Sequence, residues 1–228
     1  MIESLLASPF FGVSLCFVTF CLGRWVQKKT GWMLANPLII AMSVCVFLLL
    51  ILRIPYEAFA GGADFLGAML GPVTALLGLG IYNQRKILKA YFLPVLLGCT
   101  AGSIVSMISV LLLCRLFDLD TAITAAMLPK SCTTPIAIGI AESHGGLVAV
   151  APVSVIVSGL TGGLCAPMWC RWFRITDPVA QGLAVGASSH VLGTPKAREM
   201  GELQGAMSSI AIGVCGLISV MISLFLPL

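Results

Sequence analysis

The chain has 228 residues, of which 59% are hydrophobic and only 10% are charged, against about 25% charged residues in an ordinary soluble domain. A mean hydropathy of +1.06 leaves too few polar residues to cover the surface of a soluble fold. Composition therefore predicts an all-α polytopic membrane protein with no room for a separate soluble domain. The net charge of +4 is spread over short loops, so no nucleic-acid partner is expected.

Six uncharged stretches are long enough, or nearly so, to cross a bilayer, which takes about 20 apolar residues in a helix. In chain order they are residues 5–23, 37–52, 65–82, 90–114, 145–170 and 203–228. No basic region or small-residue cleavage site opens the chain, so the first stretch is expected to be a retained span rather than a signal peptide.

Two further apolar segments, 121–142 and 178–202, are interrupted by proline and polar residues. If each of the two segments enters the membrane and returns on the side from which it came, ten of the 13 basic residues lie on one side of the membrane. Lysine and arginine cluster in this way on the cytoplasmic side of membrane proteins. If both segments cross, giving eight spans, Arg171 and Arg174 fall on the opposite face. We therefore expect six spans plus two broken or re-entrant segments, with both termini outside; eight spans remain the alternative.

The two broken segments share a short repeat, because Thr134-Pro135-x-Ala137 recurs as Thr194-Pro195-x-Ala197, 60 residues later. In the six-span arrangement the two copies enter from opposite faces, as a local inverted repeat. Such repeats place a transporter's binding site near the bilayer midplane. Within a single membrane domain, we expect residues 1–89 to be a scaffold and residues 90–228 the substrate-binding part.

The breaks carry the candidate chemistry. Pro129 is expected to end one half-helix, and Thr134 and Pro135 to cap and start the next. The second break is expected to restart its helix in the same way at Thr194 and Pro195. A lysine beside each helix start makes a receptor for a small anion. The candidate substrate-binding residues are Lys130, Ser131, Thr133, Thr134, Ser188, Ser189, His190, Gly193, Thr194 and Lys196.

His190 and Glu199 are the candidates for proton coupling, since histidine titrates near neutral pH. Plainer roles stay open for these residues. Lys130 could reach the membrane interface without binding a ligand, and the hydroxyl residues could only cap backbone groups. His190 could make an interhelical hydrogen bond, and Glu199 could serve a helix end near Lys196.

Other chemistry is not expected. Most of the nine cysteines lie within or at the ends of apolar runs and form no C-x-x-C pair, so neither a metal site nor a cofactor is predicted. The chain also lacks an H-E-x-x-H motif and a Walker sequence. Ser189 and His190 are adjacent and have no orienting carboxylate, so an enzyme is not predicted.

At the two breaks the sequence resembles the LrgB/CidB family. The resembling residues are the run from Leu128 to Ala137, Gly145-Gly146, and Ser189-His190-x-Leu192-Gly193-Thr194. The resemblance extends over nearly the whole chain, including Asn36-Pro37-Leu38.

The resemblance implies two functions. One is a secondary transporter of small carboxylates such as pyruvate, glycolate or glycerate, as in the LrgB-like half of a plastid glycolate/glycerate translocator. The alternative is a holin-like or antiholin-like modulator of murein hydrolase activity and autolysis. It also implies a bacterial inner-membrane location and a small LrgA/CidA-type partner; a homo-oligomer stays open.

Overall fold

The computed structural model describes residue 8 and residues 10–31 and 35–226. Within this part of the chain, all regular elements are helices. The chain divides into two compact units, Met1–Val73 and Thr74–Leu228, which are described separately. The division falls inside one helix, α5 (Leu70–Asn83).

The first unit contains three helices in sequence order: α2 (Phe10–Thr30), α3 (Pro37–Ile51) and α4 (Tyr56–Ala68). Asn36 caps α3, because its Oδ1 accepts a hydrogen bond from the backbone N–H of Leu38 at 2.8 Å. Gly23 lets α2 approach the backbone of Pro37, where a Cβ would collide. The start of the predicted span 5–23 lies outside the described residues.

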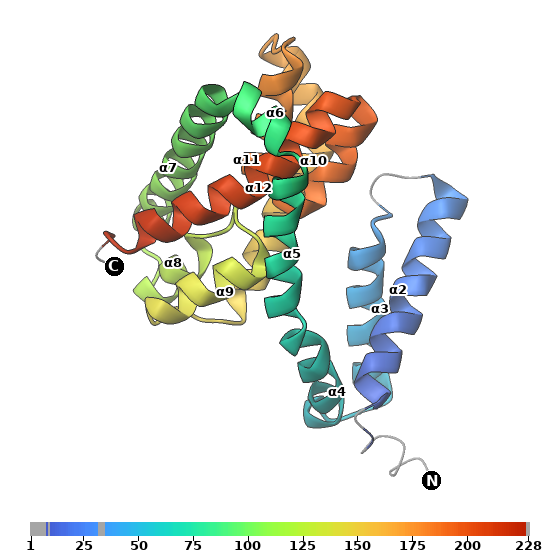
Figure 1. Ribbon diagram of the computed structural model, residues 1–228. Coiled ribbons are helices and arrows are strands. Elements are labelled where there is room, and N and C mark those ends of the chain that lie inside the picture. The colour runs from blue at the N-terminus through green and yellow to red at the C-terminus, as the bar shows by residue number, and fades with distance from the viewer. Residues whose placement is uncertain (1–7, 9, 32–34, 227–228) are drawn as a thin grey trace. The chain divides into compact units, whose positions relative to one another are not determined.

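The second unit contains the rest of the helices. They are α6 (Arg85–Ala90), α7 (Phe92–Leu116), α8 (Thr121–Met127), α9 (Thr134–Ser143), α10 (Val150–Trp172), α11 (Pro178–Met200) and α12 (Glu202–Ser223). Its main core lies where α12 packs against α7 and α11, and includes Val95, Leu183, Met207 and Ile210. Figure 1 shows α12 beside these two helices.

Five helical stretches of the described chain are long and apolar enough to cross a membrane. They are Phe10–Thr30, Tyr56–Asn83, Phe92–Leu116, Val150–Trp172 and Glu202–Ser223. The apolar helix α3 is shorter, with 15 residues, and matches the short second stretch expected from the sequence. The prediction of an all-α polytopic membrane protein is therefore confirmed.

The first broken segment folds back on itself. After α8 the chain turns through residues 128–133, and α9 packs beside α8. Just beyond α9, the N–H of Leu147 donates to the carbonyl of Ala122 at 3.0 Å, so the chain returns to the point where the segment began. We call α8, the turn and α9 hairpin 1. This fold-back is the geometry expected of a re-entrant segment.

The second broken segment also folds back, because α11 consists of two helical arms joined at a kink. Its chain reverses at His190, whose backbone is not helical (φ 40°, ψ −134°). Val185 and Ala197 then pack in one cluster, whereas a straight helix would hold them about 18 Å apart. The amide of Gln204 donates to the side chain of Gln181 at 3.1 Å, so the chain again ends beside its start. We call the two arms of α11 hairpin 2.

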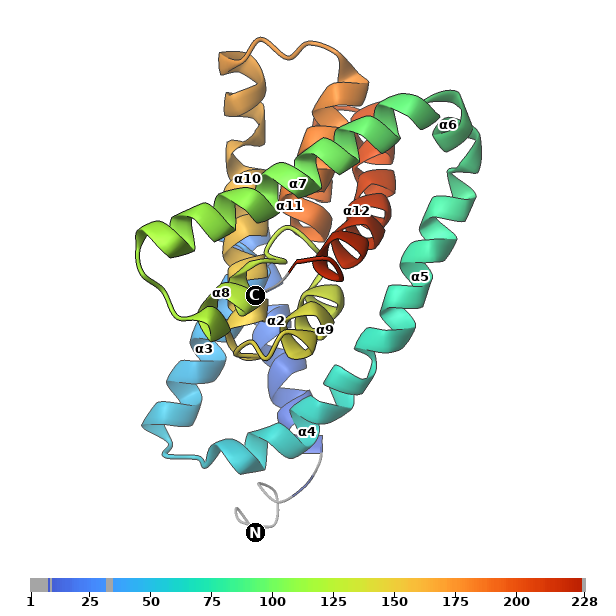
Figure 2. The same cartoon turned by 90° about the vertical axis from the view of Figure 1, so that its left-hand side faces the viewer.

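The two hairpins enter the second unit from opposite ends. α10 joins them, and its 23 residues extend about 35 Å. Figures 1 and 2 both show hairpin 1 near one end of α10 and the α10–α11 connection at the other. This is the inverted pair expected from the sequence repeat. The predicted external position of both termini concerns residues 1–7 and 227–228, outside the described residues.

Candidate functional site

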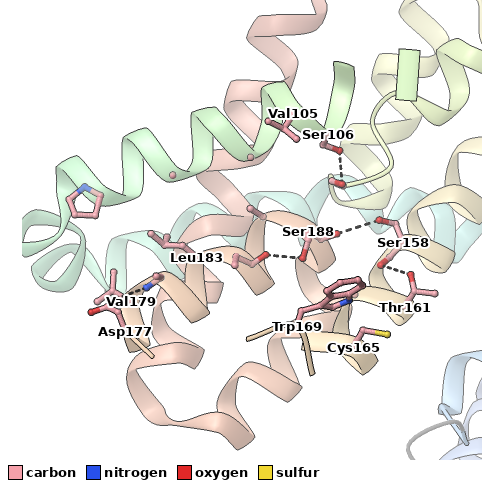
Figure 3. Close-up of a pocket in the computed structure, with 18 of the residues that line it drawn as sticks. Val105, Ser106, Ser158, Thr161, Cys165, Trp169, Asp177, Val179, Leu183 and Ser188 are labelled. Carbon is pink, nitrogen blue, oxygen red and sulfur yellow. Dashed lines mark hydrogen bonds between the residues drawn. The ribbon is translucent and has the colours of Figure 1, made fainter. Parts of the chain in front are cut away.

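A cavity of about 990 Å³ lies in the second unit, lined by α7, α10, α11 and the tip of hairpin 1. Figure 3 shows Ser106 of α7, Ser158 and Thr161 of α10, and Ser188 of α11 around it. Of the ten candidate substrate-binding residues, three line this cavity: Lys130, Ser131 and Ser188. Both hairpins therefore contribute to one space.

Lys130 is a half-buried cation at this cavity. Its Nζ lies 3.4 Å from the hydroxyl of Ser131 and 3.5 Å from that of Ser106, and these two hydroxyls are 2.8 Å apart. Among the described residues, no acidic side chain forms an ion pair with Lys130. A carboxylate entering the cavity would supply the missing anionic partner.

The other predicted residues at the first break, Thr133 and Thr134, are not on the lining of this cavity. The expected N-cap, Thr134, is instead the first residue of α9; Thr133 is the N-cap, with extended backbone (φ −73°, ψ 150°). Pro135 is therefore the second residue of α9. Proline fits either of the first two helical positions, because the N–H groups at these positions have no partner within the helix. The hydroxyl of Thr133 is buried and has no hydrogen-bond partner among the described residues.

The tip of hairpin 2 is held on α10 by His190. Its Nε2 lies 3.0 Å from the carbonyl of Val155; because a carbonyl only accepts, this nitrogen carries the proton. The ring is buried and packs against Gly159, where a Cβ would collide with it. This is the interhelical hydrogen bond left open as the plainer role of His190.

The second segment breaks at His190, within the run 188–196 that interrupts it in the sequence, but its helix does not restart at Thr194 and Pro195 as expected. Thr194 lies inside the second arm, where its hydroxyl donates to the carbonyl of His190 at 2.9 Å and lies 2.9 Å from the hydroxyl of Ser208 on α12. Gly193 packs against Val185 and Ser189 of the first arm. Ser189 is fully buried and lies 3.0 Å from the Ser188 hydroxyl.

Lys196 and Glu199 form an ion pair of 2.7 Å on the outside of hairpin 2, where Glu199 is well exposed. Neither side chain lines the cavity. This pairing matches the helix-end role left open for Glu199. The lysines at the two predicted breaks, Lys130 and Lys196, therefore have different surroundings.

Besides Tyr91, three serine and threonine residues of the lining were not anticipated: Ser106 on α7, and Ser158 and Thr161 on α10. They lie within apolar spans rather than at a break, so no local motif marks them. Applying the 60-residue offset of the repeat to the neighbouring spans could have indicated the helices that carry them. It pairs Gly102 with Gly162, and both glycines line the cavity.

No group of three or more histidine, cysteine or acidic residues within the described ranges could hold a metal ion. The polar groups of the cavity are hydroxyls and one ammonium, with Asp177 and Trp169 also on its lining. Asp177 caps α11, since its Oδ1 accepts from the N–H of Ala180 at 2.8 Å. The arrangement suits binding of an anion by hydrogen bonds.

Comparisons with known proteins identify the family of this chain. Residues 16–228 match the LrgB-like family. Curated relatives named "Antiholin-like protein LrgB" from Bacillus cereus and Bacillus anthracis are 33% identical over 222 residues, covering 96% of this chain and 96% of theirs. No solved structure gives a significant match. The protein is a multi-pass membrane protein, and it belongs to the LrgB family.

Proposed function

We propose that this protein is a secondary transporter, or a transporter subunit, for small mono- and hydroxycarboxylates. The observation that supports this most is Lys130, an ammonium at the tip of a re-entrant hairpin that faces a cavity and has only hydroxyl partners there. A carboxylate would accept hydrogen bonds from the ammonium and the neighbouring hydroxyls. Two hairpins entering from opposite ends are the arrangement in which transporters alternate access to a central site.

The relatives' names favour a second candidate function. They are called antiholin-like, which supports a modulator of murein hydrolase activity and autolysis more directly than it supports carboxylate transport. In that function the hairpins would shape helix packing or an oligomeric pore. We propose a bacterial inner-membrane location for either function, with both termini outside and a small LrgA/CidA-type protein as partner.

Uptake into proteoliposomes tests the first function. The purified chain is reconstituted with and without an LrgA-type partner, and uptake of radiolabelled lactate and pyruvate is measured against concentration. A transporter gives saturable uptake, which Lys130→Ala abolishes. Robust uptake by a folded Lys130→Ala protein would rule out the proposed site.

A leakage assay tests the second function. A pore releases trapped solutes of unrelated chemistry, with rates graded by size and no saturation. Autolysis is then compared in cells that carry the wild type or Lys130→Ala. If Lys130→Ala loses uptake but keeps the effect on autolysis, the two functions are separate.

A further inference from the structure

The first unit contains an apolar groove that the proposed function does not use. Its volume is about 500 Å³, and it lies between α2, α3 and α4. The lining includes Phe17 and Phe20 of α2, Leu38 and Leu49 of α3, and Phe59 of α4. Among the described residues, none on this lining carries a charge. A ligand of the groove is therefore held there by apolar contact.

The groove offers few polar groups and has the length of one leaflet of a bilayer. Thr19 and Tyr56 carry the hydroxyls of its lining, and the Thr19 hydroxyl donates to the carbonyl of Leu15 in its own helix at 2.8 Å. Leu38 and Leu49 are 11 residues apart on α3, which is a rise of about 16 Å. The hydrocarbon core of a bilayer is about 30 Å thick, so the groove spans about half of it.

The two ends of the groove are formed differently. Figure 1 shows α2 and α3 side by side and running in opposite directions. At one end the last third of α2 meets the start of α3, where Gly23 lies against the backbone of Pro37. At the other end α4 lies beside the beginning of α2, where Gly12 lies against the carbonyl of Phe59. We call these the open end and the α4 end.

The open end of the groove is basic. Arg24 and Lys28 follow Phe20 at intervals of four residues on α2, so all three lie on one face of the helix. Both cations are exposed, and neither forms an ion pair with a described residue. The acidic residues of the described part of this unit, Glu57 and Asp64, belong to α4 at the opposite end. An anionic group therefore fits the open end.

Trp25 and Lys29 indicate the depth of the open end in the membrane. Trp25 is exposed, and the Nζ of Lys29 lies 4.8 Å from the centre of its ring. Tryptophan is enriched at the boundary between the hydrocarbon core and water. The open end therefore lies at the level of the lipid phosphates, with the apolar groove extending from it toward the middle of the bilayer.

We propose that the groove binds one anionic phospholipid, with an acyl chain between α2 and α3 and the phosphate at Arg24 and Lys28. The chain gains contact along the apolar lining, and the phosphate oxygens accept hydrogen bonds from the guanidinium and ammonium groups. A zwitterionic phospholipid has the same chains, but its own cation offsets the charge of its phosphate, so it binds more weakly. The proposal does not depend on the transport function.

Photocrosslinking of the purified full chain in detergent locates the lipid. The probe is phosphatidylglycerol with a diazirine at the end of one acyl chain, and mass spectrometry identifies the labelled peptides. We expect label near the α4 end of the groove. Unlabelled phosphatidylglycerol should displace the probe with a Kd at least about fivefold lower than that of phosphatidylcholine with the same chains. Equal displacement by both lipids, or label spread evenly over all helices, would overturn the proposal.

Variants at the open end test the phosphate contact. Arg24→Gln and Lys28→Gln are each expected to raise the Kd of phosphatidylglycerol about fivefold, and to leave that of phosphatidylcholine unchanged. Arg53→Gln is the matched control, because Arg53 is also exposed but follows α3 and so lies at the far end of this helix. An equal rise in Kd for all three variants would overturn the assignment of the phosphate to Arg24 and Lys28.

A bulky substitution on the lining tests the position of the acyl chain. Val46 is an exposed residue of the lining, so Val46→Trp should narrow the groove without disturbing a core; it is expected to lower labelling at least about fivefold. Leu50→Trp is the control, since Leu50 is exposed one turn later on α3 and is not on the lining. Unchanged labelling of Val46→Trp would overturn the proposal. So would a change in its oligomeric mass by light scattering that the Leu50→Trp protein does not show, because the groove would then be covered by protein.

Discussion

The hydroxyls of Ser106 and Ser131 lie 2.8 Å apart and connect α7 to the tip of hairpin 1. Both also lie within hydrogen-bond distance of Lys130 Nζ. One span and one hairpin therefore position the same ammonium. Because Ser106 lies in the middle of an apolar helix, its role follows from the fold and not from a local motif.

Ser106→Ala should weaken carboxylate binding without unfolding the protein. The change leaves Lys130 and Ser131 with one hydroxyl partner fewer, which is expected to raise the KM of uptake about fivefold. Ser109→Ala is the matched control, because the Ser109 hydroxyl donates to the backbone carbonyl of Ser106 at 2.7 Å and is not on the cavity lining. An equal rise in KM for both variants would contradict a specific role for Ser106.

Lys130 and Lys196, the lysines at the two predicted breaks, should differ sharply in their effect on uptake. Lys130→Gln is expected to lower kcat/KM for carboxylate uptake at least about thirtyfold, because the substrate carboxylate loses its cationic partner in the cavity. Lys196→Gln breaks only an ion pair with the exposed Glu199, and such pairs contribute roughly 0–1 kcal/mol. Uptake kinetics of both variants, with size-exclusion profiles as the folding check, distinguish the two sites. A large loss of uptake in a well-folded Lys196→Gln protein would return Lys196 to the site.

Much of the fold could be predicted from the sequence because bilayer length and charge are global constraints. Uninterrupted apolar runs gave the spans, and the distribution of basic residues favoured two re-entrant segments over two crossings. The first break was also readable, because Pro129 and Pro135 bracket residues 130–134. The predictions of spans and of re-entrant segments depend on composition over many residues, so small errors in the boundaries of a segment do not affect them.

The sequence placed the second break within residues 188–196, but the residue at which the chain reverses could not be located in the same way. The chain reverses at His190 with φ 40° and ψ −134°, a conformation that is readily adopted only by glycine. No such residue occupies the position, and packing against Gly159 and Val155 stabilises it instead. Pro195 suggested that the helix restarts there. It has no N–H, so the only helical hydrogen bond it removes is the one to the carbonyl of Val191, which is the first residue of the second arm. The hydroxyls of Ser158 and Thr161 were missed because tertiary packing alone turns them toward the cavity.

Close approach of hairpin 2 to α10 should make two glycines sensitive to substitution. A Cβ at Gly162 would overlap the Ser189 hydroxyl, and one at Gly159 would overlap the His190 ring. Gly162→Ala and Gly159→Ala are each expected to destabilise the protein by roughly 1–3 kcal/mol, seen as a lower thermal unfolding temperature in detergent. Gly139→Ala is the control, because nothing lies near its Cβ position; its helix should be unchanged or stabilised by roughly 0.5–1 kcal/mol. Equal unfolding temperatures in all three variants would contradict the packing described for the hairpin tip.

The re-entrant hairpins predict a specific pattern of accessibility in the membrane. Asp120 and Glu142 are exposed residues that flank hairpin 1, and Thr176 and Glu202 are exposed residues that flank hairpin 2. Because each hairpin begins and ends at the same place, cysteines at 120 and 142 should react with an impermeant maleimide from one side. Cysteines at 176 and 202 should react from the other.

The distribution of basic residues assigns positions 176 and 202 to the cytoplasmic side. Labelling is carried out on intact cells and on inverted vesicles, with the wild-type chain as the blank for its nine native cysteines. The crossing alternative makes the opposite prediction within each pair: Asp120→Cys and Glu142→Cys would then react from different sides. Since the comparison is between the two ends of one hairpin, the result decides between re-entry and crossing even if the orientation of the whole protein is the reverse of that expected.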